Sequence, residues 1–548
     1  MDEPRMRLNR TDFLLIFLLA LLTLGLRAFQ LATTEVTARD SISYIHIAWR
    51  LEHGDWLKVI PAAPQHPGYP LAILAASVPA RLLAPNDYPY AMQLAAQLAS
   101  AAASVLLVLP LYRLGRDLFS PRVAFGAVLL FQCLPCGGRI LADGLSEGLF
   151  LLFAVSALAL AASALRTGSV GGFALSGLAG GLAYLTRPEG LLVPAAAGVT
   201  LLGMQLFAAW RRPWRKVLAC GAALTVAVLL VGGPFMVLIH GVTNKNTGNH
   251  LLDGSPPGAA PAETSDAAGA AGGPVFAVWW QGGSPDGAAR SLWGLETLAS
   301  VLAKAFFFVF WVPALAGLVC FHRRLRAVPG AWMMLMVCAG LAALLYRVAT
   351  RMGYLSDRHT ILILVCGVVW AAAALDGLGC GLAGLLARAR PALAGRGWAD
   401  SRTWAACLLL VAATAPLFKT LESLHGDRVG FRAAGYWLRQ HAKADDTVFD
   451  PFGWSAYYAG RYFRDDAVLY FREETFPKGP WKYVVVEESA NAHSHLVTAA
   501  DALRLAHEHK PPIQSFPAPR GREMATVAVY DVGGAMVPLE VADRPKAR

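Results

Sequence analysis

The sequence predicts a polytopic α-helical membrane protein with about 11 transmembrane helices and a small C-terminal α/β soluble domain on the outer face. Three observations support this prediction. The chain of 548 residues is 56% hydrophobic and only 16% charged, and its mean hydropathy is +0.45. Apolar segments long enough to cross a bilayer recur from residue 12 to residue 421. After residue 422 the pattern changes to short amphipathic segments, which are typical of a soluble domain.

About eleven segments are expected to span the membrane, because each approaches the roughly 20 apolar residues that a crossing requires. They are residues 12–32, 88–112, 122–141, 145–165, 170–185, 188–209, 216–240, 296–320, 330–347, 359–376 and 403–421. The segment 69–84 is also apolar, but it is short and contains Pro70 and Pro79. We expect it to form a helix that lies in the outer membrane interface.

The basic residues indicate the orientation of the chain. The net charge of +11 comes largely from arginines in short connections between apolar segments, a pattern that sets topology and does not predict nucleic-acid binding. Arg5, Arg7 and Arg10 precede the first apolar segment, which lacks a cleavage site and is expected to be retained. An odd number of crossings then predicts an integral protein of the cell (inner) membrane, with a cytoplasmic N-terminus and an extracytoplasmic C-terminal domain.

The expected division is a multi-span membrane domain at 1–422, with long outer loops at 33–87 and 241–295, and an extracytoplasmic α/β domain at 423–548. The stretch Gly254–Pro274 is almost wholly Gly, Ala, Pro and Ser and is expected to be mobile. In the second domain, helices are expected at 431–441 and 495–507, and strands at 447–450, 482–487 and 525–530. Four histidines near that second helix lack metal-ligand spacing and are expected to be solvated: His493, His495, His507 and His509.

Polar groups gather on the expected outer face. Asp40 follows the first span, and Tyr44 lies four residues later on the same helical face. A carboxylate at a membrane surface costs free energy, so Asp40 marks a candidate functional site. The other candidates lie in the run Gln65-His66-Pro67-Gly68-Tyr69-Pro70, in Asp143-Gly-Leu-Ser146-Glu147, in Thr186-Arg187-Pro188-Glu189, and in Asp357-Arg358-His359.

Each candidate also has a purely structural explanation. Arg187 and Glu189 could neutralise each other at a helix break, and Asp357 with Arg358 could form a surface pair. Asp143 could cap the next helix, or share a helical face with Glu147 four residues later. Several carboxylates and cations on one face of the membrane nevertheless favour a common site.

The chemistry of these groups suits one kind of reaction. An outward-facing carboxylate can deprotonate an acceptor hydroxyl, and Arg or His can hold a phosphate and stabilise it as a leaving group. Nucleotide sugars are not supplied outside the cytoplasm, so an activated sugar would have to arrive on a lipid phosphate.

The ordered set of motifs resembles the C-type integral membrane glycosyltransferases (GT-C), in particular the protein O-mannosyltransferases and the aminoarabinose transferase of lipid A. The resemblance covers residues 10–420. It rests on an Asp after the first span, the His-Pro-Gly-Tyr-Pro turn, Asp-x-x-Ser-Glu, Gly-Leu-Ala-Tyr-Leu-Thr-Arg-Pro-Glu-Gly, and a later Asp-Arg-His.

The resemblance implies transfer of a sugar, usually with inversion, from a polyprenyl-phosphate donor to a hydroxyl acceptor on a lipid, a glycan or a protein. Asp40 matches the catalytic base. The residues expected to bind the donor or its phosphate are Tyr44, His66, Arg187 and Arg358. Supporting roles are expected for Gln65, Tyr69, Asp143, Glu147, Glu189 and Asp357. Membrane lipid is the other partner, and no nucleic acid is expected.

Two positions depart from the pattern of the family. Arg39 precedes Asp40 where protein mannosyltransferases tend to carry paired acids, and Gln65-His66 stands where a Glu-Lys pair is expected. The first departure argues against a protein acceptor and against mannose, and the second argues against a bound metal. A divalent metal stays an open possibility, and no cofactor is assigned. A transporter or flippase of lipid-linked sugars is the alternative function, although neither an internal repeat nor ionisable groups at mid-membrane favour it.

Overall fold

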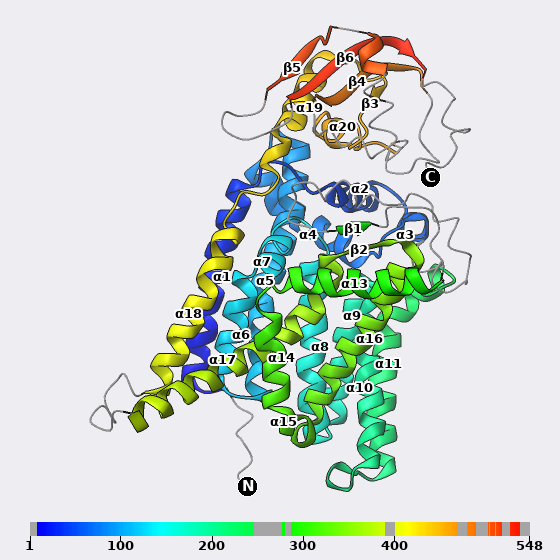
Figure 1. Ribbon diagram of the computed structural model, residues 1–548. Coiled ribbons are helices and arrows are strands. Elements are labelled where there is room, and N and C mark those ends of the chain that lie inside the picture. The colour runs from blue at the N-terminus through cyan, green and yellow to red at the C-terminus, as the bar shows by residue number, and fades with distance from the viewer. Residues whose placement is uncertain are drawn as a thin grey trace.

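The computed structural model describes residues 8–245, 277–279, 287–389, 400–465, 467, 479–488, 502, 505–509, 511–517 and 526–536. The expected mobile stretch 254–274 and most of the expected helix 495–507 lie outside these residues, as do His493 and His495. Within them the fold is a helical bundle with a small sheet at one end (Figure 1). The prediction of a polytopic helical membrane fold with a small C-terminal α/β region is confirmed.

Eight helical stretches in the described part of the chain are long and apolar enough to cross a membrane. These are α1 (Arg10–Thr33), α5 (Tyr88–Leu118), α8 (Glu147–Thr167), Pro188–Leu206 around α10 (Leu192–Gly203), α11 (Trp214–Leu238), α16 (Pro329–Met352), Asp357–Ala389 around α17 (Ile361–Ala389), and α18 (Ser401–Thr420). Shorter apolar helices include α6 (Pro121–Cys133) and α9 (Val170–Thr186). The expected count of eleven crossings is therefore not confirmed.

One expected crossing is not a single helix in the structure. The segment 296–320 forms two helices, α13 (Gly287–Ala305) and α14 (Trp311–Cys320). The turn between them holds Phe307 and Phe308, both with positive φ, which ends the first helix. The helix α13, which carries Arg290, Glu296 and Lys304, lies across the bundle and does not run along it (Figure 1).

Four helices of the first outer loop and its neighbourhood lie at the upper end of the bundle: α2 (Arg39–His53), α3 (Trp56–Ala62), α4 (Gly68–Leu83) and α7 (Pro135–Ile140) (Figure 1). The helix at 68–83 confirms the expected helix at 69–84, while its place in the membrane interface stays a prediction. A short antiparallel pair, β1 (Ala277–Trp279) with β2 (Tyr354–Ser356), precedes the helical turn η5 (Asp357–Thr360). Another short helix, α15 (His322–Ala327), lies at the lower end.

The C-terminal region begins with η8 (Gly426–Arg428) and α19 (Val429–His441) and continues with α20 (Trp454–Tyr458). Its four-stranded sheet has the order β3-β4-β6-β5. The strands are β3 (Val448–Phe449), β4 (Trp481–Glu488), β5 (Gln514–Phe516) and β6 (Thr526–Ala535). The strand β3 is parallel to β4, and the other pairs are antiparallel. The expected helix at 431–441 and the three expected strands are present, whereas most of the expected helix at 495–507 lies outside the described residues.

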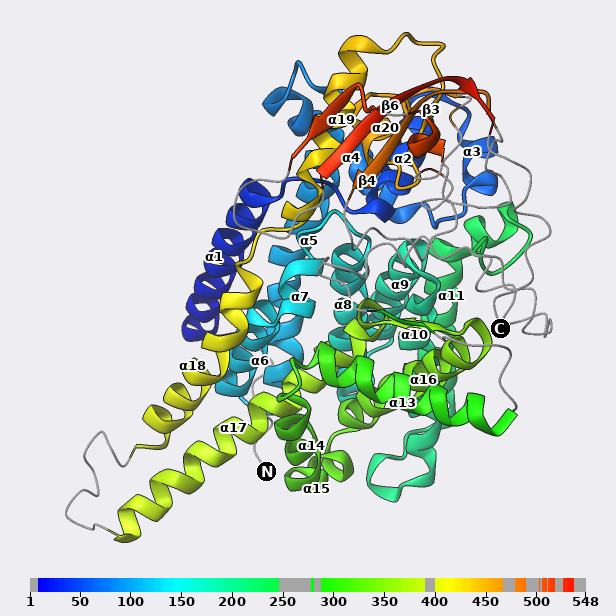
Figure 2. The same cartoon turned by 45° about the horizontal axis from the view of Figure 1, so that its top comes forward.

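The C-terminal region packs closely on α2. Figures 1 and 2 both show α20 and the sheet directly over α2. One hydrophobic cluster joins Ile42 and Ile45 of α2 to Phe431, Trp454 and other residues of the C-terminal region. The division at residue 422 stays a prediction, because this shared core joins the two parts.

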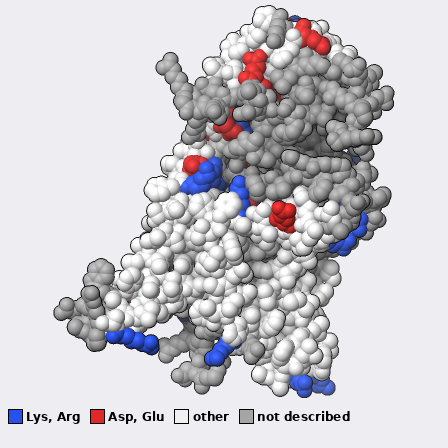
Figure 3. All heavy atoms as spheres, in the orientation of Figure 1, with Lys and Arg blue, Asp and Glu red and all other residues white. Residues whose placement is uncertain are grey.

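Charged side chains are distributed unevenly along the bundle. On the face that Figure 3 shows, the lower end carries Lys and Arg, whereas the visible Asp and Glu lie in the middle and upper parts, where Lys and Arg are present too. The chain enters α1 at the lower end, and the sheet lies at the upper end (Figure 1). The lower end of this face therefore carries basic side chains, and the orientation of the chain in the membrane stays a prediction.

Candidate active site

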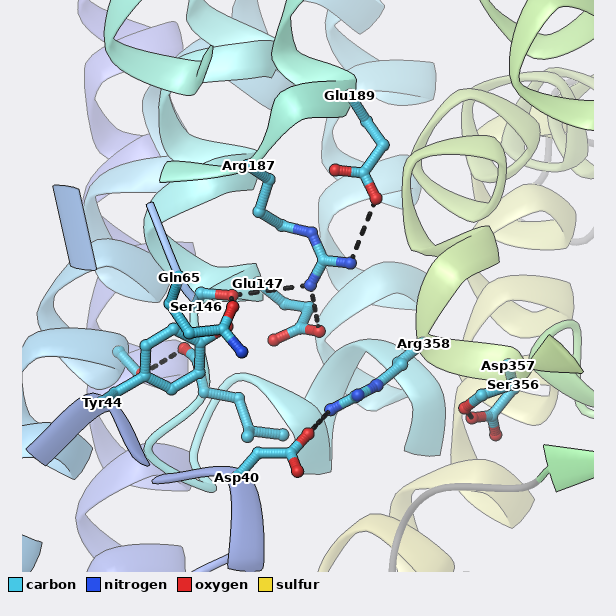
Figure 4. A network of polar contacts seen from close by, with 12 residues as sticks. Asp40, Tyr44, Gln65, Ser146, Glu147, Arg187, Glu189, Ser356, Asp357 and Arg358 are labelled. Carbon is cyan, nitrogen blue, oxygen red and sulfur yellow. Dashed lines mark hydrogen bonds and ion pairs between the residues drawn. The ribbon is translucent and has the colours of Figure 1, made fainter. Parts of the chain in front are cut away.

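The candidate site lies where α2, the start of α8, the end of α9 and η5 meet (Figure 4). Asp40 belongs to the first turn of α2, and its side chain is 16% exposed. Arg358 reaches it from η5, forms an ion pair with it, and is 11% exposed. These two residues are 318 positions apart in the sequence. The fold therefore brings the expected base and one expected phosphate-binding residue into direct contact.

A second ion-pair network lies beside the first. Arg187 contacts the Glu147 carboxylate at 2.6 Å and the Glu189 carboxylate at 3.3 Å. The Arg187 and Glu147 side chains are almost fully buried, with 7% and 1% exposed, whereas that of Glu189 is 20% exposed. Figure 4 shows the Glu147 carboxylate between Arg187 and the Asp40–Arg358 pair.

Local sequence explains how Arg187 reaches the site. Pro188 disfavours the helical conformation for the residue before it, and Arg187 is extended, with φ −151° and ψ 140°. The helix α9 therefore ends at Thr186, and Arg187 forms its C-cap. Glu147 is the first residue of α8, where a carboxylate is stabilised by the positive end of the helix dipole.

Tyr44 contacts polar side chains from two other segments of the site. Its hydroxyl lies 3.1 Å from the Ser146 hydroxyl and donates to the Gln65 side-chain oxygen at 3.4 Å. Burial raises the pKa of the Tyr44 phenol, so the group stays protonated and can donate a hydrogen bond. The ring of Tyr69 packs edge-on against that of Tyr44, with centroids 5.1 Å apart.

Sequence reasoning missed Lys245, which lies in the segment after α11. Burial and the neighbouring charge of Arg187 lower the pKa of Lys245 to about 8, and the carboxylate of Glu189 acts in the opposite direction. The segment is tied down beside the site, because the Asn244 side chain donates to the Pro61 carbonyl at 2.9 Å and the Thr243 hydroxyl contacts His66. The only sequence signal was a short polar run directly after a span.

His66 is held by hydrogen bonds to two other segments of the chain. Its Nδ1 lies 2.7 Å from the Tyr184 carbonyl and its Nε2 lies 2.9 Å from the Thr243 hydroxyl, so both ring nitrogens have protein partners. Burial lowers the pKa of His66 to about 3, and the ring is therefore neutral at pH 7. A neutral ring with two partners is suited to holding the chain in place, and its expected phosphate contact stays a prediction.

Three other expected residues are directed elsewhere. The Asp143 carboxylate lies 2.6 Å from His425 of the C-terminal region. Asp143 and Glu147 do not share a helical face, because Asp143 lies in a turn and Gly144 has a φ of +69° before α8 begins. Asp357 points away from the network in Figure 4. The Tyr69 hydroxyl donates to the Ala96 carbonyl at 2.8 Å.

The described residues do not build a metal centre. Among them, no group of three or more His, Cys, Asp or Glu side chains is arranged to hold a metal ion. The three carboxylates of the site are instead each paired with an arginine.

Comparisons with known proteins agree with this architecture. A family model described as dolichyl-phosphate-mannose-protein mannosyltransferase matches residues 91–235. No curated protein matches the sequence.

Solved structures match over most of the chain. ArnT from Cupriavidus metallidurans bound to undecaprenyl phosphate is 14% identical with a TM-score of 0.54, and the match covers 95% of this chain and 98% of that one. The apo oligosaccharyltransferase of Archaeoglobus fulgidus is also 14% identical with a TM-score of 0.55, over 87% of this chain and 69% of that one. The oligosaccharyltransferase AglB from the same organism, in complex with an inhibitory peptide and a dolichol-phosphate, is 15% identical with a TM-score of 0.50, over 85% and 61%. The family resemblance seen in the sequence is confirmed, and the chain has the fold of the C-type integral membrane glycosyltransferases.

Proposed function

We propose that this protein transfers a sugar, a hexose or a pentose, from a polyprenyl-phosphate donor to a hydroxyl acceptor at the outer membrane face. Asp40 is the catalytic base, and the acceptor is a lipid, a glycan or a protein. The observation that carries the proposal is the pairing of Asp40 with Arg358 beside the Arg187 network. Undecaprenyl phosphate and dolichol-phosphate, which are bound in the similar structures of ArnT and AglB, support this class of donor.

The orientation of the chain follows from the same proposal. The basic lower end of the bundle faces the cytoplasm, which places the site and the C-terminal region outside. The membrane is the cell (inner) membrane, where a polyprenyl-phosphate sugar can be presented to an outward-facing site.

The ion pairs suggest how donor binding prepares the base. Arg358 is held by Asp40, and Arg187 is held by two carboxylates. A donor phosphate is a stronger partner for a guanidinium than a single carboxylate, since it offers more acceptor oxygens and more charge. When the phosphate takes Arg358, Asp40 loses its counter-ion and its affinity for a proton rises. Asp40 thus becomes a better base only when the donor is present.

The chemical step is a single displacement. The acceptor oxygen attacks the anomeric carbon, its proton passes to the Asp40 carboxylate, and the bond between that carbon and the phosphate oxygen breaks. The electron pair leaves with the polyprenyl phosphate. Arg358, Arg187 and Lys245 stabilise the charge of the departing phosphate, so no strong general acid is needed. One displacement inverts the configuration of the sugar.

Two oxygen atoms in the network are suited to a sugar. Glu147 Oε2 and Glu189 Oε2 are buried and accept no hydrogen bond from the described residues. Buried acceptors normally have donors, and sugar hydroxyl groups supply them. We propose that these carboxylates help to orient the sugar ring, with Tyr44 and Gln65 on the opposite side of the site.

Replacing Asp40 by Asn tests the proposal. The purified protein in lipid nanodiscs is given undecaprenyl-phosphate mannose or undecaprenyl-phosphate arabinose labelled in the sugar, with a host membrane extract as the source of acceptors. The expected result is loss of label from the lipid with the wild type and at least about a 100-fold slower loss with Asp40→Asn.

A matched control is available on the same helix. Glu52 of α2 is also a carboxylate paired with an arginine, Arg81, but this pair is partly exposed and lies outside the site. Glu52→Gln should therefore retain turnover. Equal turnover of Asp40→Asn and Glu52→Gln would remove Asp40 from the mechanism.

A further inference from the structure

We infer that the C-terminal region positions Asp40 and is part of the catalytic unit, an inference that rests on the proposed function. The first contact is at Thr37, three residues before Asp40. Its backbone N–H donates to the Tyr458 hydroxyl at 3.0 Å, and its carbonyl accepts from Trp454 Nε1 at 3.0 Å. Both backbone polar groups of Thr37 are therefore held by side chains of α20, which lies over α2 in Figures 1 and 2.

A second contact lies directly beside Asp40. Arg39 is 8% exposed and donates to the Pro451 carbonyl at 3.1 Å. The turn that presents Pro451 is itself fixed, because the buried Asp450 carboxylate accepts from the backbone N–H groups of Phe452 and Ser455 at 3.0 and 2.6 Å. Arg39 therefore binds the C-terminal region, which accounts for an arginine next to the proposed base.

A third set of contacts approaches from the other side. The Ser41 hydroxyl lies 2.6 Å from the Gly144 carbonyl and 3.1 Å from the Asp143 carbonyl, and the Asp143 carboxylate lies 2.6 Å from His425. Arg428 contacts His425 at 3.0 Å, and its guanidinium lies over the Trp454 ring, 4.4 Å from the ring centroid. These contacts connect Ser41, the residue after Asp40, to Trp454, whose side chain donates to the Thr37 carbonyl.

The physical consequence is a fixed first turn of α2. A helix of 15 residues such as α2 is marginal without tertiary contacts, and its first turn frays most easily. The contacts of Thr37, Arg39 and Ser41 hold the backbone on both sides of Asp40. A displacement of the base by about 1 Å can slow catalysis by about 100-fold. Loosening this turn should therefore lower the turnover rate strongly and weaken donor binding less.

Two adjacent tyrosines provide a matched test. Tyr458 and Tyr457 are both fully buried in α20, and each has a hydroxyl that bonds across to the membrane part. The Tyr458 hydroxyl accepts from Thr37 and donates to the Gln93 side-chain oxygen of α5 at 2.6 Å, whereas Tyr457 donates to the Pro89 carbonyl at 2.7 Å, also in α5. Trp454→Phe is a second probe, since it removes the bond to the Thr37 carbonyl and retains a ring.

The expected results separate positioning from mere attachment. Tyr458→Phe and Trp454→Phe should each lower kcat by about tenfold with an unchanged donor KM, while Tyr457→Phe stays within about twofold of the wild type. Hydrogen–deuterium exchange should show faster exchange of the amides at residues 37–42 in Tyr458→Phe and not in Tyr457→Phe. The same kcat loss in both tyrosine variants, or no change in exchange at 37–42, would overturn the inference. If wild type and Asp40→Asn consumed the donor equally, the proposed function would fail instead.

Discussion

Replacing Arg187 by Gln leaves two carboxylates without their partner in the interior of the protein. Glu147 is nearly inaccessible, and its contact with Arg187 measures 2.6 Å. Glu189 is farther from Arg187, at 3.3 Å, and is 20% exposed. The three members of this network therefore differ in how much each contributes to stability.

The expected magnitudes follow from burial. Removing one partner of a buried ion pair costs about 3–5 kcal/mol, because the other charge stays buried without compensation. A partly exposed pair contributes about 0–1 kcal/mol. Arg187→Gln should thus lower the free energy of unfolding by about 3–5 kcal/mol and Glu189→Gln by less than about 1 kcal/mol. Glu147→Gln should fall between them, since Arg187 keeps Glu189 as a partner.

Unfolding by SDS in mixed micelles, followed by circular dichroism, measures these differences. We expect the loss of unfolding free energy to be largest for Arg187→Gln, intermediate for Glu147→Gln and smallest for Glu189→Gln. Equal losses for Arg187→Gln and Glu189→Gln would refute the reasoning, because they would show that Glu147 is not held by Arg187 as the geometry indicates.

Three further predictions concern the site and its surroundings. Lys245, with a pKa lowered to about 8, carries its charge below that pH and loses it above. The donor KM should therefore rise by up to about fivefold between pH 8 and pH 9, and Lys245→Arg should remove this rise in a pH profile. Arg27 is fully buried and donates to the side chains of Ser104 and Gln132, so Arg27→Met should cost about 1–3 kcal/mol in SDS unfolding while the donor KM stays unchanged. A Cβ at Gly68 would lie 2.7 Å from the Leu185 carbonyl oxygen, so Gly68→Ala should separate α4 from α9 and cost about 1–3 kcal/mol in the same assay.

The sequence was a good guide to local features. Hydropathy predicted the membrane fold, and the 3.6-residue and alternating patterns located α19 and the strands β3, β4 and β6. The break at Arg187-Pro188 was predictable too, because proline restricts the residue before it. These features depend on neighbours in the chain, and a single sequence contains that information.

Long-range features were less predictable. The pairing of Asp40 with Arg358 depends on how α2 and η5 pack, which no local pattern determines. The expected helical alignment of Asp143 with Glu147 failed because Gly144 adopts a positive φ, and Asp143 reaches His425 instead. Lys245 was missed since nothing in its own segment shows that Thr243 and Asn244 tie it to the first outer loop.

The role of the C-terminal region was also hidden in the sequence. Nothing in the sequence distinguishes Trp454 and Tyr458 from ordinary core aromatics of a small domain, and both side chains are buried. Only the packing of α20 on the segment before α2 reveals their hydrogen bonds to Thr37. The same packing joins residues on both sides of position 422 in one hydrophobic cluster.

The fate of the donor lipid is the most direct test of the central claim. Proteoliposomes that contain the wild-type protein are given undecaprenyl-phosphate mannose labelled in the sugar, with membrane extract outside, and both the chemical form and the leaflet of the lipid are measured. We predict that label leaves the lipid, appears in an acceptor and leaves undecaprenyl phosphate behind, for this sugar or for arabinose in its place. An intact donor that has only moved between leaflets would contradict the account and identify a transporter of lipid-linked sugars.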